Sequence, residues 1–152
     1  TLINSGQLGN YFNRDDQSRI EVASPKSKIT GTVNYKMNKF GAMVRVVRFG
    51  KVVYLDPSIN SSANFVANAF NGGALETLDQ TFSPKVVTDV TVNYQLTKQF
   101  NLAVGANNLF DVYQDVHTHS GNMSSGRFVY SRRVQQMGFN GRYIFGRVNF
   151  NF

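Results

Sequence analysis

Cysteine and tryptophan are both absent from the 152 residues. Without cysteine, the chain has no disulfides, no thiol catalysis and no cysteine-based metal site. It also lacks any run of about eighteen apolar residues, which excludes a transmembrane helix. Membrane-spanning β-strands are not excluded, because only every second residue of such a strand must be apolar. The nucleophile-elbow, phosphate-loop and zinc-protease motifs are missing too, so we expect no enzyme.

Acidic residues are scarce: 9 Asp and Glu stand against 16 Lys and Arg, a formal net charge of +7. Nucleic-acid-binding proteins gather basic residues into a patch or stripe. Here the basic residues are spread along the chain, so we predict no nucleic-acid partner. Thirteen Phe, seven Tyr and thirteen Gly, together with many Asn, Ser and Thr, make a composition that favours strands over helices.

Alternation with a period of two residues is the strongest pattern in the sequence. Between Lys28 and Met37, polar residues alternate with apolar residues or Gly. A strand that lies between water and an apolar medium needs one face of each kind. Similar alternation predicts five strands, at about 26–37, 40–54, 85–96, 100–112 and 136–152. In the last of them the aromatic residues change parity, which predicts a bulge near Gly141 or Gly146.

The connections between these strands alternate between long and short. Residues 1–25, 55–84 and 113–132 form long polar segments, whereas the breaks at 38–39 and 97–99 are tight turns. Outer-membrane β-barrels have this asymmetry, with short periplasmic turns and long external loops. The pattern therefore predicts an all-β, antiparallel transmembrane barrel with three external loops in this chain.

Aromatic residues on the apolar parity lie within a few positions of the short turns or of the C-terminus. Such a set would form a girdle at the periplasmic interface, where aromatic rings are favoured. The alternative is that these rings fill the core of a soluble all-β sandwich that serves as a binding module. The predicted girdle consists of Tyr35, Phe40, Tyr94, Phe100, Phe150 and Phe152.

Five strands are too few for a closed membrane barrel, because the smallest have about eight. Open strand edges cannot be satisfied in lipid. We therefore expect the chain to be part of a larger barrel. A small, complete outer-membrane barrel with an adhesion or structural role is the alternative, and the segments 1–25 and 55–84 would then have to supply three more strands.

Several motifs resemble the C-terminal end of TonB-dependent receptors. The segment Gly105-Ala-Asn-Asn-Leu-Phe-Asp111 is similar to a motif on the next-to-last barrel strand of that family. Segments 127–133 and 138–143 resemble members from Bacteroidetes-type bacteria, in which Ser-Pro-Lys also recurs before strands, as here at 24–26 and 83–85. The ending Val148-Asn-Phe-Asn-Phe152 is similar to the signal read by the barrel assembly machinery.

The resemblance implies a barrel of about 22 strands around a plug domain, with localisation in the bacterial outer membrane. It implies active import of a scarce ligand, such as siderophore-iron, haem, cobalamin or a glycan, powered through TonB. The plug and the segment that contacts TonB are not among these residues. Implied partners are outer-membrane lipid and lipopolysaccharide, the rest of the barrel with its plug, TonB, the assembly machinery and a small-molecule ligand; no cofactor is implied.

Ligand-contact candidates lie in the third external loop. Arg127, Arg132 and Arg133 could attract an anionic ligand or lipopolysaccharide phosphates. His117 and His119 could bind a metal or haem iron, or could be ordinary polar loop residues. No third ligand is evident, so we predict no metal site.

The remaining candidates are structural. In the motif, Asn107, Asn108, Leu109, Phe110 and Asp111 lie where a strand meets its loop, and Asn or Asp side chains there commonly satisfy backbone groups. Val148, Phe150 and Phe152 carry the assembly signal. Arg48 and Arg142 fall on the apolar parity about nine or ten residues above the inner strand ends, so we expect them to reach towards phosphates at the outer interface.

Overall fold

The computed structural model describes residues 12, 14–55, 65–67, 72, 75–119, 123, 128–131 and 133–151. The chain divides into two compact units, each built from three stretches of sequence. The loop unit contains residues 1–26, 50–84 and 114–138, and the sheet unit contains residues 27–49, 85–113 and 139–152.

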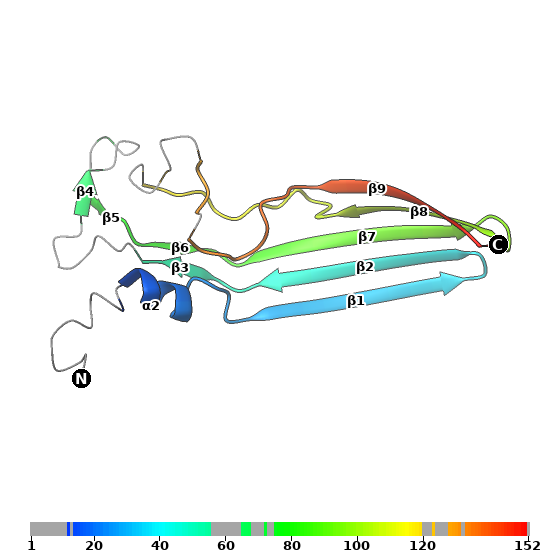
Figure 1. Ribbon diagram of the computed structural model, residues 1–152, viewed down its shortest axis with the longest axis horizontal. Coiled ribbons are helices and arrows are strands. Elements are labelled where there is room, and N and C mark those ends of the chain that lie inside the picture. Colours follow the sequence, from blue (N-terminus) through cyan, green and yellow to red (C-terminus); the bar gives the residue numbers. More distant parts are fainter. Residues whose placement is uncertain are drawn as a thin grey trace. The chain divides into compact units, whose positions relative to one another are not determined.

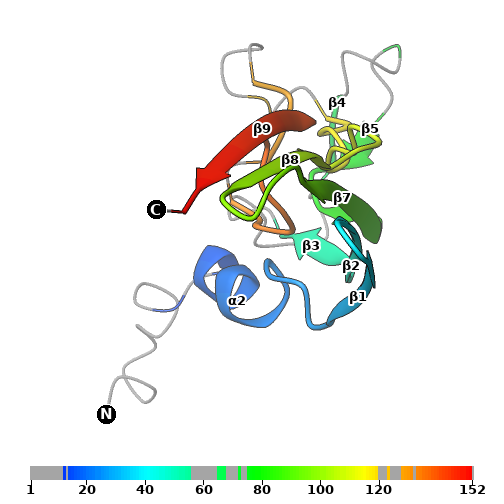
Figure 2. The ribbon, with the colours of Figure 1, turned by 90° about the vertical axis from the view of Figure 1, so that its right-hand side faces the viewer.

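The sheet unit is an antiparallel sheet whose five strands follow the order β1-β2-β7-β8-β9 (Figure 1). Viewed end-on, the strands lie along an arc (Figure 2). The all-β, antiparallel prediction is confirmed, while the described sheet is open, with β1 and β9 at its edges. The strands are β1 (Lys28–Met37), β2 (Phe40–Phe49), β7 (Lys85–Gln95), β8 (Phe100–Asn107) and β9 (Tyr143–Phe150).

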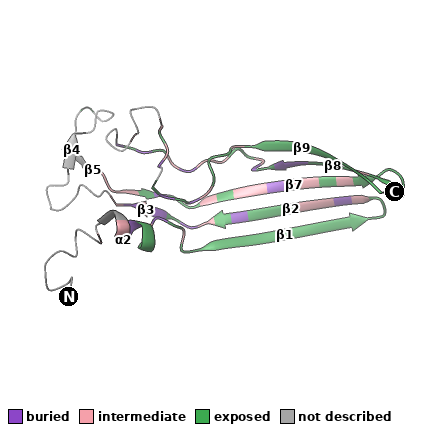
Figure 3. Cartoon of the chain, in the orientation of Figure 1, coloured by how far each residue is buried: buried purple, intermediate pink, exposed green. Residues whose placement is uncertain are grey.

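The strand register divides the sheet into an apolar face and a polar face. Val33 pairs with Val44, and Val44 pairs with Val90, so these residues share the apolar face. Most residues of this face are exposed. In Figure 3, exposed residues, drawn in green, make up most of the edge strands β1 and β9. With the exception of Tyr143, the exposed large apolar side chains of the five strands all lie on the apolar face: Ile29, Val33, Tyr35, Met37, Val44, Val46, Val86, Val92, Tyr94, Phe100, Leu102, Val104, Ile144, Val148 and Phe150.

The hairpin turns at one end of the sheet are short. Asn38 takes up a positive φ of 51° between β1 and β2, a conformation that Asn tolerates better than most residues. Between β7 and β8, the Thr97 hydroxyl accepts hydrogen bonds from the backbone N–H groups of Gln99 and Phe100, at 3.2 and 3.0 Å. These hydrogen bonds to the Thr97 side chain stabilise the turn.

Three of the expected strand boundaries differ in the structure. The strand expected at 40–54 ends at Phe49, and Val52–Tyr54 form a separate strand, β3, which pairs with β6 (Gln80–Phe82) in the loop unit. The strand expected at 100–112 ends at Asn107, because Asn108 has a positive φ of 50°. The strand expected at 136–152 begins only at Tyr143.

A bulge was expected near Gly141 or Gly146. At Gly146 this prediction is wrong, since β9 pairs with β8 without interruption from Tyr143 to Phe150, and Gly141 lies before the strand begins. Tyr143 and Phe145 instead remain on the polar face, with their rings stacked at a centroid distance of 6.2 Å. A single regular strand therefore carries aromatic residues on both faces, with the two on the polar face stacked on each other.

The loop unit contains short elements within segments that were expected to be loops. They are α2 (Arg14–Glu21), β4 (Phe65–Ala67), β5 (Leu75–Thr77) and β6, and the unit also contains β3, which was expected to be the end of the second strand. A small apolar core of Ala23, Val52, Tyr54, Phe82 and Val134 holds this unit together. Hydrogen bonds from Val53 N to Val22 O and from Gln135 N to Ala23 O tie its three stretches to one another, at 2.9 and 3.0 Å. Among the described residues, none of the helical structure is long and apolar enough to cross a membrane.

Candidate functional site

The polar face of the sheet forms a hollow of about 580 Å³ near the short turns. Side-chain amides and cations line it, among them Asn93, Asn101, Lys36, Lys39 and Arg147. Gly41 also lines the hollow. Its lack of a side chain leaves space for the Asn93 side chain, with which a Cβ on Gly41 would collide. The lining offers hydrogen-bond donors, acceptors and positive charge in one place.

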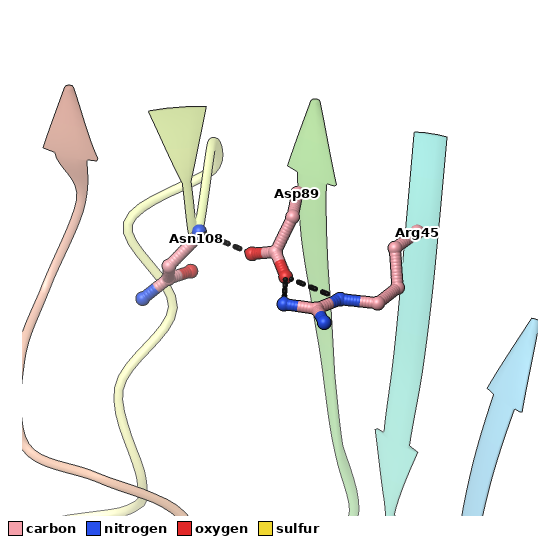
Figure 4. A network of polar contacts seen from close by, with 3 residues as sticks. All are labelled: Arg45, Asp89 and Asn108. Atoms are coloured by element: carbon pink, nitrogen blue, oxygen red, sulfur yellow. Dashed lines mark hydrogen bonds and ion pairs between the residues drawn. The ribbon is translucent and has the colours of Figure 1, made fainter. Parts of the chain in front are cut away.

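Beside the hollow, an ion pair connects strands β2 and β7 (Figure 4). The Arg45 Nε and Nη2 groups donate to Asp89 Oδ2 at 2.9 and 2.6 Å. The other carboxylate oxygen, Asp89 Oδ1, accepts the backbone N–H of Asn108 at 2.8 Å. Asp89 is 5% exposed. One of its carboxylate oxygens binds Arg45 of β2 and the other binds the turn that follows β8, so Asp89 joins β7 to both.

The motif turn after β8 is stabilised by its own Asn and Asp side chains. Asn108 donates through Nδ2 to Val112 O and accepts from Val112 N through Oδ1, both at 2.8 Å. Asp111, with a φ of 57°, accepts the Arg142 N–H through Oδ1 at 2.6 Å. Leu109 N donates to Thr88 O at 2.7 Å. Asn108, Leu109 and Asp111 therefore use these groups within the fold, whereas Phe110 is exposed.

The histidines of the third loop are buried in the loop unit, at 4% exposure for His117 and 3% for His119. The His117 ring lies edge-on to the rings of Tyr54 and Phe82, with centroid distances of 5.5 and 5.6 Å. Its Nδ1 lies 3.3 Å from Gln80 Oε1. Burial lowers the pKa of His117 below its ordinary value of 6.5. The interpretation of this residue as part of an ordinary polar loop is therefore wrong.

Three polar side chains that no sequence pattern had indicated join the region of β3 and β6 to the third loop and to the segment that follows this loop. Gln80 Nε2 donates to Val116 O at 2.7 Å, and Asp115 Oδ2 accepts from both N and Oγ of Ser83 at 2.6 Å. Gln136 Nε2 donates to Gly50 O and Ser83 O at 2.9 and 2.6 Å. These bonds span 32 to 86 positions in sequence, so no local pattern reveals them.

The arginine candidates are only partly described. Arg127 and Arg132 lie outside the described residues, as does Phe152 of the assembly signal. Arg133 is exposed and lines a second hollow of about 410 Å³ in the loop unit, together with Arg19, Ser24 and Gln135. No group of three or more His, Cys, Asp or Glu able to hold a metal occurs in the described part of the chain.

The remaining predicted residues lie on or beside the sheet. Arg48 is on the apolar face, paired with Ile29 and Val86, and Arg142 immediately precedes β9. Aromatic residues of neighbouring strands are in contact near the short turns. Ring centroids are 6.4 Å apart for Tyr35 and Phe40 and 4.8 Å apart for Phe100 and Phe150; Tyr94 is exposed on the same face, and Val148 lies two residues before Phe150.

Comparison with known proteins gives a likeness of fold. No family model matches the sequence, and no curated protein matches it. A point mutant of the ferric enterobactin receptor from Pseudomonas aeruginosa is similar to 85% of this chain, with a TM-score of 0.54 and 16% identity. The ferripyoverdine receptor of the outer membrane of Pseudomonas aeruginosa, bound to ferripyoverdine, is similar to 84% of it, with a TM-score of 0.50 and 16% identity.

The chain covers 16% and 14% of the lengths of these two receptors. At this identity the likeness concerns the fold: an antiparallel sheet of the kind found in the wall of outer-membrane receptors.

Proposed function

We propose that this chain is the C-terminal barrel segment of a TonB-dependent receptor, which imports a scarce ligand across the bacterial outer membrane. The chain would supply part of the barrel wall, part of the external mouth and the C-terminal assembly signal. A ferric siderophore is the ligand class that best fits the two structural neighbours, which are receptors of ferric enterobactin and ferripyoverdine.

The observation that carries the proposal is the exposed apolar face of the sheet. In water, each fully exposed large aliphatic or aromatic side chain forgoes about 1.5–3 kcal/mol of burial energy. Monomeric soluble proteins rarely expose a contiguous apolar patch of more than a few hundred Å². Here the apolar side chains extend over all five strands, and Val33 at the middle of β1 is 70% exposed. Lipid is the medium in which such a face is stable.

The opposite face supports the same reading. Arg45, Asp89 and the amide-lined hollow all lie on the polar face, which would border the barrel lumen. The rings of Tyr35, Phe40, Phe100 and Phe150 gather near the short turns, where an aromatic girdle would meet the periplasmic interface. Closure of the barrel would satisfy the open edges of β1 and β9.

The sequence motifs support the proposed family. The Asn-Asn-Leu-Phe-Asp segment begins at the last residue of β8, the strand that pairs with the final strand β9. The similar motif of TonB-dependent receptors also lies on the next-to-last strand. The loop unit would then lie on the external side, and its arginines, including Arg133, would help to attract an anionic ligand. Arg48 and Arg142 would reach lipid phosphates at the outer interface.

The proposal is tested by uptake. In a strain that lacks the full-length gene, accumulation of one compound from a panel of radiolabelled ferric siderophores, haem, cobalamin and glycans should fall to background. The same loss should follow deletion of TonB. Loss of surface attachment with unchanged uptake of every compound would instead support a small barrel with an adhesion role.

Lipid contact is tested separately in the full-length receptor. Val33→Lys places a charge on the apolar face of β1, and we expect it to lower the folded amount in the outer membrane, because a lysine facing lipid at mid-depth costs about 2–4 kcal/mol. Asn34→Lys, one residue further along on the polar face, is the matched control and should leave that amount unchanged. Equal effects of the two substitutions would contradict a lipid-facing apolar face.

A further inference from the structure

We infer that Asn140 is a site of spontaneous covalent modification, at which the side-chain amide is lost and the residue becomes aspartate or isoaspartate. Asn140 precedes Gly141 in the stretch that leads into β9. The inference concerns the peptide chemistry of this stretch. It depends neither on a location in the membrane nor on the transport activity proposed above.

The reaction takes place within the chain. The backbone nitrogen of Gly141 attacks Cγ of Asn140, so that a bond from this nitrogen to Cγ forms and the bond from Cγ to Nδ2 breaks. Ammonia leaves with the proton of the Gly141 N–H, and a cyclic imide remains. Water then opens the imide. Hydrolysis at Cγ yields aspartate, whereas hydrolysis at the backbone carbonyl carbon yields isoaspartate, in which the chain continues through Cβ and Cγ.

The structure leaves both reacting groups accessible. Asn140 is exposed, and β9 begins only at Tyr143. Within the described part of the chain, no hydrogen bond engages the Asn140 amide or the Gly141 N–H. The backbone of Asn140 is thus not held in a strand ladder, and its side chain can approach the nitrogen of the next peptide, as the attack requires.

Gly141 makes the attacking nitrogen accessible. A Cβ on the residue after an asparagine would crowd this nitrogen, and glycine has none. The fold favours glycine here for a separate reason, because a Cβ on Gly141 would collide with the Tyr113 hydroxyl and the Asp111 carboxylate. Packing against the turn that follows β8 therefore keeps the reactive pair Asn140-Gly141 in the chain.

Other asparagines are less reactive in this structure. Among the described residues, Asn140 is the one asparagine that precedes a glycine. Asn149 is also exposed, but it lies within β9 and precedes the bulky Phe150. Asn108 has its amide engaged, because its Nδ2 donates to Val112 O and its Oδ1 accepts from Val112 N.

The products would disturb the start of β9. The backbone N–H of Arg142 donates to Asp111 Oδ1 at 2.6 Å, directly after Gly141. Isoaspartate at position 140 adds a carbon atom to the path of the chain just before this bond. We therefore expect the modified chain to lose the hydrogen bond between Arg142 and Asp111, which the exchange rate of the Arg142 amide measures.

The direct test is incubation of the purified, folded full-length protein at neutral and at mildly alkaline pH. Peptide mass spectrometry follows the loss of ammonia, and an isoaspartyl methyltransferase labels isoaspartate. Asn149 is the matched control. Asn140 should convert roughly a hundredfold faster than Asn149, because misplacement of reacting atoms by about 1 Å costs a factor of that size. Conversion should accelerate with pH, since the Gly141 nitrogen must lose its proton.

The variant Asn140→Gln keeps an amide at this position but would have to form a larger ring. It should abolish methylation of the peptide that contains residue 140 and leave the amount of folded protein unchanged. Two results would overturn the inference: conversion of Asn140 in the folded protein that is no faster than that of Asn149, or methylation of this peptide that persists in Asn140→Gln.

Discussion

Acid should loosen the loop unit through His117. The imidazole is buried between Tyr54 and Phe82, and burial lowers the pKa of His117 in the folded state below its ordinary value of 6.5. At neutral pH the ring is uncharged whether or not the loop is packed, and stability is then at its full value. As pH falls below 6.5, the unpacked loop binds a proton that the packed loop does not, so stability declines with acid. One such group changes stability by at most about 1.4 kcal/mol per pH unit.

The substitution His117→Phe removes the proton-binding site and preserves an aromatic ring in the same place. It gives up the 3.3 Å contact with Gln80 Oε1, but that oxygen still accepts the Thr118 N–H at 2.9 Å. The cost at neutral pH should therefore be below about 1 kcal/mol. His117→Ala leaves a cavity and loses two ring contacts, for a cost of about 2–4 kcal/mol.

Hydrogen exchange in the full-length protein measures both effects. The amides of Val53 and Gln135 join the three stretches of the loop unit, so their exchange reports its opening. After correction for intrinsic rates, protection should fall between pH 7.5 and 5 in the native protein and remain constant in His117→Phe. The same loss of protection in His117→Phe would refute the assignment of acid sensitivity to this ring.

Three further predictions concern the sheet unit. Asp89→Asn retains the acceptor for the Asn108 N–H and loses the ion pair with Arg45, which should cost about 1–3 kcal/mol in urea titrations followed by gel mobility. Gly141→Ala should cost about 1–3 kcal/mol because its Cβ would collide with the Tyr113 hydroxyl, whereas Gly146→Ala, with open space around it, should be tolerated. If Arg48 reaches lipid phosphates as proposed, Arg48→Glu should reduce the lipopolysaccharide that copurifies with the full-length protein, and Arg48→Lys should not; equal amounts for the two would contradict an interfacial role.

The alternation of residue types predicts the strands of the sheet well, because each strand has one apolar and one polar face. It fails where the backbone leaves the sheet. Residues 52–54 continue the apolar alternation of β2, yet they pair with Gln80–Phe82 in the loop unit. The register around Gly146 also remains regular, although Tyr143 and Phe145 change the pattern of aromatic residues. Alternation of residue types alone cannot tell whether an aromatic ring lies on the polar face or on the apolar face of the sheet.

The loop unit was far less predictable. The residues around His117 and His119 have the composition of an exposed loop, yet both side chains are buried. His117 packs against Tyr54 and Phe82, which are distant in sequence. Gln136 joins Gly50 and Ser83 through hydrogen bonds over 86 and 53 positions. Contacts of this kind follow from which strands pair, not from local residue patterns.

The sheet unit reverses the usual relation between polarity and burial. Asp89 on one face is nearly inaccessible, while Val33, Val104 and Ile144 on the other are largely exposed. A soluble protein buries a carboxylate only when it is paired and keeps its aliphatic side chains inside. Here the paired carboxylate stabilises the polar side, and nothing in the described chain covers the aliphatic side. Under the proposed function, lipid would supply the apolar contacts, and a charge placed on the aliphatic side should then cost more than the same charge placed one residue away on the polar face.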